Sequence, residues 1–115
     1  MGKRQRSAPD RLSLVFGALA DPTRRAMLDR LRTRELTVSE LAKPFTTSQP
    51  TISKHLKVLE RAGLVVRGRD AQFRPRALRA APLKDANHYL ELFRAQWDER
   101  LDRLEAYVAR LQRQS

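Results

Sequence analysis

The sequence has no cysteine in its 115 residues. Disulfide bonds and thiolate metal ligands are therefore both excluded. Long apolar runs are also missing, and none approaches the roughly 18 residues that a membrane-spanning helix needs. The basic segment 1–10 is not followed by the apolar run of a signal peptide. These absences predict a cytoplasmic protein that does not associate with a membrane.

Acidic residues are scarce, 13 against 24 lysines and arginines, and the formal charge is +11. A field of this sign attracts polyanions, with nucleic acid the commonest candidate and an anionic membrane surface the next. The excess is concentrated in residues 49–79, which hold eight basic and two acidic residues, whereas residues 83–115 are neutral. The sequence therefore predicts a basic patch in its middle.

Helix-start signals recur along the first half of the chain. A helical apolar face runs from Asp10 to Ala20, and Asp21 followed by proline then fits an N-cap with proline at the first helical position. The segment from Thr37 to Glu40 fits a capping box, which opens a third, short helix. Together with the helix described next, these signals predict four helices before residue 63.

The fourth helix has two different faces. Ser48 is its expected cap, and Gly63 is its expected end, because glycine adopts the left-handed conformation at little cost. Ile52, Leu56 and Leu59 form a narrow apolar stripe. Lysines and arginines lie on the opposite side of the helix. A solvated basic face on a core helix is the alternative interpretation, but the local charge excess favours contact with DNA.

Two short strands are expected around residues 64–66 and 73–78, and a long final helix is expected after Pro82. Pro75 cannot donate a ladder hydrogen bond, so the second strand is predicted to be an edge or bulged strand. We therefore predict a mainly α fold with a small β-hairpin, in the order α-α-α-α-β-β-α. Its plan is a winged helix-turn-helix domain over residues 10–112, preceded by a disordered basic segment, residues 1–9.

In this plan the fourth helix is the recognition helix, which docks through its apolar stripe and presents its other side to the major groove. Short polar side chains near its start would reach base edges, while basic side chains further along and on the hairpin would hold phosphates. The predicted DNA-contacting residues are Gln49, Pro50, Thr51, Ser53, Lys54, Lys57, Arg61, Arg67, Arg69, Arg74 and Arg76.

Apolar residues of the last helix recur at steps of three or four, which is typical of a seam between helices. We predict that this seam covers the first helix and a partner subunit in a homodimer. The predicted dimer-interface residues are Leu12, Phe16, Leu19, Leu90, Phe93, Trp97, Leu101, Leu104 and Val108.

Several segments also carry a family resemblance: ALADPTRRAMLDRL, LTVSELA, SQPTISKHLKVLERAGLV and the basic hairpin. Together they resemble the ArsR family of bacterial winged helix-turn-helix transcriptional regulators, over about residues 12 to 110. The segments GRDAQFRPRAL and PLKDANHYLELFRAQWDERLDRLEAYV resemble a metal-independent branch of that family. The resemblance implies a homodimer that pairs its first and last helices and represses transcription by binding a palindromic operator.

The sequence departs from the metal-sensing members of the family. Thr37 and Ser39 stand where those members carry cysteines, and hydroxyls are poor ligands for soft metals. Asp85 and His88 lie one turn apart, but no second histidine follows them. We therefore expect no metal and no other cofactor.

Three alternatives remain at this stage. The charge alone would also suit a sequence-neutral nucleoid-type or RNA-binding protein. Small-molecule control through a ligand between the first and last helices stays open. An enzyme has no support, because His55 and Ser53 lack an orienting carboxylate and no phosphate-binding glycine loop is present. His55 is expected to be a packing or hydrogen-bonding residue.

Overall fold

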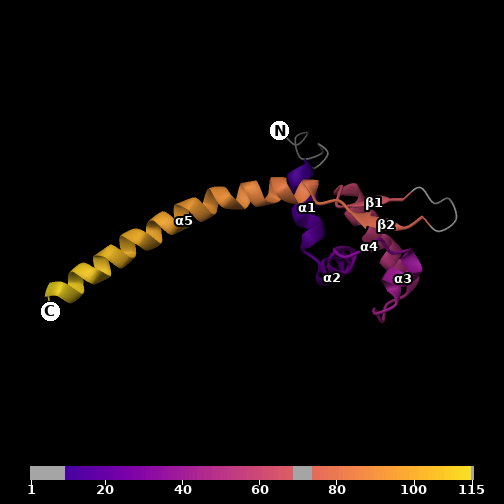
Figure 1. The fold of residues 1–115 in the computed structure, drawn as a ribbon, viewed down its shortest axis with the longest axis horizontal. Coiled ribbons are helices and arrows are strands. Elements are labelled where there is room, and N and C mark those ends of the chain that lie inside the picture. The colour runs from indigo at the N-terminus through magenta and orange to yellow at the C-terminus, as the bar shows by residue number, and fades with distance from the viewer. Residues whose placement is uncertain (1–9, 69–73, 115) are drawn as a thin grey trace, which may run out of the picture.

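The computed structural model describes residues 10–68 and 74–114. Its elements, in chain order, are α1 (Arg11–Leu19), α2 (Pro22–Leu31), α3 (Val38–Ala42), α4 (Gln49–Arg61), β1 (Val65–Arg67), β2 (Arg76–Leu78) and α5 (Ala81–Gln114). The first four helices and the hairpin form a body, and α5 extends away from it (Figure 1). This order confirms the predicted one. The disorder predicted for residues 1–9 lies outside the described residues.

The helices begin where side chains can satisfy their free amides. Asp21 Oδ1 accepts from the Thr23 amide at 2.8 Å, and the predicted capping box joins Thr37 and Glu40 in both directions, at 2.9 and 3.2 Å. Ser48 caps α4 as predicted. Each cap replaces water at a helix end, which stabilises the helix by roughly 1 kcal/mol.

Helix α4 ends at the predicted glycine. Gly63 has φ 77°, and its amide donates to the Glu60 carbonyl at 3.0 Å, while the Leu64 amide donates to the Leu59 carbonyl at 3.0 Å. This pair of bonds is a Schellman motif, which needs a left-handed residue between helix and strand. The chain therefore leaves α4 sharply and enters β1.

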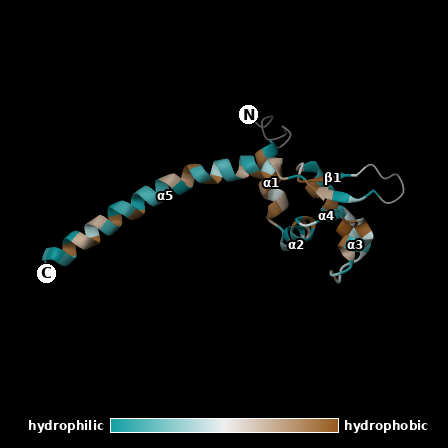
Figure 2. Ribbon diagram, in the orientation of Figure 1, coloured by the Kyte–Doolittle hydropathy of each residue, from teal (hydrophilic) through white to brown (hydrophobic). Residues whose placement is uncertain are grey.

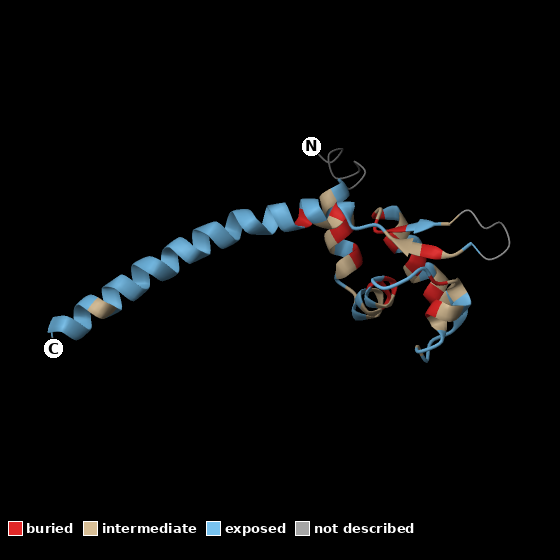
Figure 3. Cartoon of the chain, viewed as in Figure 1, coloured by how far each residue is buried: buried red, intermediate tan, exposed pale blue. Residues whose placement is uncertain are grey.

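A single core fills the body between the helices. Ile52, Leu56 and Leu59 of α4 are buried there, and the helices around them supply Val15, Ala18, Met27, Leu28, Leu31 and Leu41. Strand β1 adds Val65 to the same cluster, and the segments before β1 and α3 add Leu64 and Leu36. Figure 3 shows the buried segments gathered in the body and at the start of α5. The predicted apolar stripe of α4 is thus a core face.

The hairpin is paired on more than one side. Strands β1 and β2 are antiparallel, with Val65 opposite Leu78 and Arg67 opposite Arg76. On its other side, Arg76 exchanges two backbone hydrogen bonds with Leu36, at 2.7 and 3.1 Å. Pro75 stands just before β2, where its missing amide removes no ladder bond. Strand β2 is an edge strand of the two-stranded sheet, as predicted, and Arg76 adds a single isolated bridge on its outer side.

Helix α5 contacts the body only through its first turns. Pro82 lies inside its first turn, not before it, and Pro82 and Ala86 are the residues buried in α5. The Phe16 and Tyr89 rings meet edge to face with centroids 5.8 Å apart. Apolar residues continue along the rest of α5 among polar ones (Figure 2). Within residues 10–68 and 74–114, no helix combines the length and the apolar character of a membrane span.

Candidate nucleic-acid interface

Helix α4 divides into a buried side and an open side. Ile52, Leu56 and Leu59 are 0, 2 and 0% exposed. On the other side, Gln49, Pro50, Lys54, Lys57 and Arg61 are exposed, while Thr51 and Ser53 are half-buried. The chain itself therefore leaves the basic side of this helix open to solvent.

The first turn of α4 is held by its cap. Ser48 Oγ accepts from the Thr51 amide at 3.4 Å and lies 3.0 Å from Thr51 Oγ1. The Thr51 hydroxyl is thus occupied within the helix end, and Gln49 is the freer of the two polar side chains. This arrangement orients the residues expected to face base edges.

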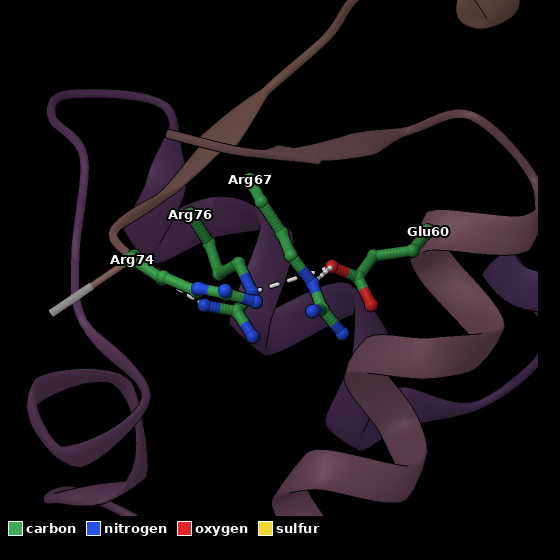
Figure 4. A network of polar contacts seen from close by, with 4 residues as sticks. All are labelled: Glu60, Arg67, Arg74 and Arg76. Carbon is green, nitrogen blue, oxygen red and sulfur yellow. Dashed lines mark hydrogen bonds and ion pairs between the residues drawn. The ribbon is translucent and has the colours of Figure 1, made fainter. Parts of the chain in front are cut away.

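The hairpin arginines differ from one another (Figure 4). Arg67 Nε donates to Glu60 Oε2 at 3.0 Å, yet its side chain stays 47% exposed. Arg76 Nε lies 3.3 Å from the same oxygen, as an ion pair without hydrogen-bond alignment, and Arg76 is only 8% exposed. Arg74 is exposed, and its carbonyl accepts a bond from the Arg76 guanidinium. Arg69 lies outside the described residues.

Arg76 requires a correction to the predicted DNA contacts. Its guanidinium is buried among Glu60 of α4 and the Arg74 carbonyl, so it cannot reach a phosphate without breaking the packing of the hairpin. Its charge offsets that of the partly buried Glu60 carboxylate, which also accepts from Arg67. The sequence showed the basic residue but not the partner that buries it.

Three further arginines carry structural contacts that sequence reasoning missed. Arg24 donates to the Ala18 and Gly17 carbonyls at 2.8 and 3.0 Å, and its Nη1 donates to His55 Nδ1 at 3.2 Å. Arg25 and Arg30 likewise donate to carbonyls at the ends of α1 and α3. These contacts satisfy helix C-termini, and the arginine at 24 ties α1 and α2 to α4. His55 is a hydrogen-bonding residue, as predicted.

Backbone hydrogen bonds at the helix starts lower the pKa values of two carboxylates. The backbone bond from Arg24 holds the pKa of Asp21 below its usual value, and the backbone bond from Thr37 does the same for the pKa of Glu40. Both groups are therefore charged near neutral pH. Neither takes part in a cluster of metal ligands, since the described chain holds no group of three or more such side chains.

The predicted dimer residues fall into two groups. Leu12, Phe16 and Leu19 are half-buried and pack against the core of their own chain. The α5 seam is open to solvent: its seven residues are 37–59% exposed, and they are Leu90, Phe93, Trp97, Leu101, Leu104, Val108 and Leu111. An apolar stripe of this length on a single helix needs a covering surface.

Known protein families and sequences include relatives of this chain. A family model described as a helix-turn-helix domain matches residues 19–68. The transcriptional repressor SdpR of Bacillus subtilis is 37% identical over 76 residues, which cover 66% of this chain and 84% of that protein.

Solved structures of transcriptional regulators are also similar to this chain. The ArsR family transcriptional regulator RHA00566 is 38% identical, with a TM-score of 0.72 over 77% of this chain and 98% of the other. A homodimeric winged helix-turn-helix DNA-binding domain from Mycobacterium bovis, Mb0332, is 28% identical, with a TM-score of 0.58 over 80% of this chain and 82% of the other. Together with the open basic side of α4, these matches show that the chain belongs to the ArsR family of winged helix-turn-helix regulators, which bind DNA and control transcription.

Proposed function

We propose that this regulator is a homodimeric repressor that binds a palindromic operator through α4 and the hairpin. The observation that carries the proposal is the division of α4, whose apolar stripe is buried while its lysines and arginine face solvent. The similar repressor SdpR and the homodimeric domain Mb0332 support the two finer parts, repression and pairing. Repression would follow from occupation of promoter DNA.

The contacts divide by distance from the start of α4. Residues of its first turns, Gln49, Pro50, Thr51, Ser53 and Lys54, would lie against base edges in the major groove. Lys57 and Arg61 would hold phosphates, together with the hairpin residues Arg67, Arg69 and Arg74. Two copies of α4 would enter successive major grooves about 34 Å apart.

The partner that covers α5 would be a second copy of this chain in antiparallel orientation. The seam is symmetric in sequence, since Leu90 and Leu111, Phe93 and Val108, and Trp97 and Leu104 are equally far from a midpoint beside Leu101. Two antiparallel copies centred there would align every apolar layer. All seven residues would then leave water, which favours association.

Charges beside the seam support the same orientation. Arg94 and Glu105 flank the seam on the same side, on opposite sides of its midpoint, and in an antiparallel pair they would lie two residues out of exact register. In an antiparallel pair, residues on the same flank face each other, so each arginine would approach the partner's glutamate at both ends. The helix as a whole is neutral after residue 82, so no net repulsion opposes its pairing.

Selection of bound fragments from the source genome tests the function. We expect recovery of fragments that share one palindrome, and a footprint with two-fold symmetry confined to it. The sequence-neutral and RNA-binding alternatives predict similar affinity for unrelated duplexes or for RNA, and that result would overturn the proposal.

Engineered cysteines test the dimer, and the natural absence of cysteine makes the readout clean. Chains with Leu90→Cys should cross-link to chains with Leu111→Cys under mild oxidation, while neither variant should cross-link to itself. Efficient self-cross-linking of each variant would show a parallel pair, and no cross-linking in any mixture would contradict pairing through the seam.

A further inference from the structure

One carboxylate joins the two DNA-facing elements of the body. Glu60 stands in the last turn of α4, and its side chain is 18% exposed. Its Oε2 atom accepts from Arg67 of β1 at 3.0 Å and pairs with Arg76 of β2 at 3.3 Å. Within the described part of residues 49–79, Glu60 is the one acidic residue. An acid here lowers the positive charge offered to DNA, so it needs another role.

The link continues beyond the ion pairs. The Arg76 guanidinium also donates to the carbonyl of Arg74, a residue with φ 42°, a conformation that non-glycine residues rarely adopt. The backbone of Arg76 bridges to Leu36, just ahead of α3. Glu60 therefore connects α4 to both strands and, through Arg76, to the segment that leads into α3.

Resting on the proposed function, we infer that Glu60 is a positioning residue that fixes the hairpin arginines relative to the base-reading turns of α4. Phosphate contacts set the register and orientation of a protein on the duplex, whereas base contacts specify sequence. If the hairpin moves independently of α4, its arginines still bind phosphates but no longer hold α4 in register. Discrimination then falls, while general affinity is kept.

The two arginines have different parts in this device. Arg76 is buried, and its guanidinium lies beside the Glu60 carboxylate as an ion pair at 3.3 Å. Arg67 is about half exposed, so a phosphate can draw its guanidinium away from Glu60 when DNA binds. In the free protein, the two ion pairs of Glu60 thus hold the hairpin against α4. When DNA binds, the pair with Arg67 can be replaced by a contact between Arg67 and a phosphate.

The test compares Glu60→Gln with Glu99→Gln. The control removes the same charge from an exposed pair with Arg103 on α5, far from the hairpin. Each protein is titrated with the duplex recovered in the genomic selection and with a scrambled duplex of equal length, over a range of salt concentrations. In Glu60→Gln the ratio of the two affinities should fall about tenfold, the discrimination that one mismatched base pair gives.

The same variant should bind the scrambled duplex more tightly, because Arg67 no longer has to leave Glu60 before it binds a phosphate. Its salt slope should stay that of the wild type, because the number of phosphates contacted in the complex is unchanged. The control should keep the wild-type ratio. Equal tightening on both duplexes would overturn the inference, because Glu60 would then act only as a charge. Wild-type protein that binds both duplexes equally would instead overturn the proposed function.

Hydrogen exchange on the DNA-free protein separates the inference from the proposed function. The Gly68 amide donates to the Pro75 carbonyl across the hairpin. Its exchange should accelerate about tenfold in Glu60→Gln and remain unchanged in Glu99→Gln, because loss of the tie lets the hairpin open locally. Unchanged exchange in both variants would contradict a positioning role.

A second variant keeps the test decisive if Glu60→Gln does not fold. Arg67→Gln cuts the exposed tie and leaves the buried pair of Glu60 and Arg76 intact. It should lower the affinity ratio by a smaller factor than Glu60→Gln, and it should weaken binding to the scrambled duplex rather than strengthen it. Should Glu60→Gln fail to fold, an unchanged ratio in Arg67→Gln overturns the inference.

Discussion

Helices α4 and α5 both carry an apolar stripe, but the stripe of α4 is buried in the core and that of α5 is open to solvent. The stripe of α4 is at most 2% exposed, whereas the seam of α5 is 37–59% exposed. Helix α4 packs within the body, but α5 extends away from it beyond Tyr89, whose ring contacts Phe16 (Figure 1). Periodicity thus predicts that a helix has an apolar face, while the surrounding chain decides whether that face is filled from within or from another molecule.

The largest expected effect is on the α4 stripe. Leu56→Ala should lower the free energy of unfolding by about 2–5 kcal/mol, because it removes buried methyl groups and leaves a cavity in the core. Denaturant unfolding followed by circular dichroism measures it. Val58→Ala is the control, since this residue of the same helix is 36% exposed and should change stability little. Equal losses from the two would erase the distinction between the faces of α4.

Next comes the α5 seam, where the expected loss is in association. Leu104→Glu would put two charges into the proposed interface, so dimerisation should weaken at least about 100-fold, or about 2.7 kcal/mol. Sedimentation over a range of concentrations measures the dissociation constant. The amides of α4 should keep their hydrogen-exchange protection at concentrations where the wild type is also monomeric. Their loss there would show that the seam serves the body of its own chain.

Within the DNA-facing surface, base-edge and phosphate contacts should separate. Lys54→Ala should weaken operator binding by about 1–3 kcal/mol and relax sequence choice, whereas Arg69→Ala should make the salt slope shallower by about 0.9 on any duplex. Titrations at several salt concentrations with operator and scrambled DNA distinguish them. Identical losses on both duplexes for both variants would contradict this division.

The smallest expected effect concerns the caps of the body. The folded-state pKa of Asp21 is lowered, chiefly by the Arg24 amide, so its contribution to stability is present above the unfolded pKa and is lost as pH falls through the folded one. The melting temperature should therefore fall below about pH 4. Asp21→Asn keeps a capping oxygen without the titrating charge, so its profile should be flatter. Identical profiles for the wild type and Asp21→Asn would show that the charge of Asp21 does not contribute to stability.

Much of the fold could be predicted, because it depends on neighbours in sequence. Asp21, Thr37 and Ser48 cap helices through amides two or three residues away, and Gly63 ends α4 by its own conformational freedom. The pairing of Leu36 with Arg76 could not be predicted, because it joins segments forty residues apart. How much of the α5 seam its own chain covers could not be predicted either, because the apolar spacing is the same whether the seam packs on α1 or on a partner.

The candidate site shows the same limit more sharply. By itself, the sequence determined that residues 49–79 are basic and that α4 has one apolar and one charged side, because composition and helical period are local properties. Only the tertiary structure decided which basic side chains stay free. Lys54 and Lys57 face solvent, whereas Arg76 is buried against Glu60 and Arg24 is bonded to α1 and His55. The physical reason is that the sequence shows where the arginines are but not which carboxylate or carbonyl each one will contact. Folding brings those partners from distant parts of the chain.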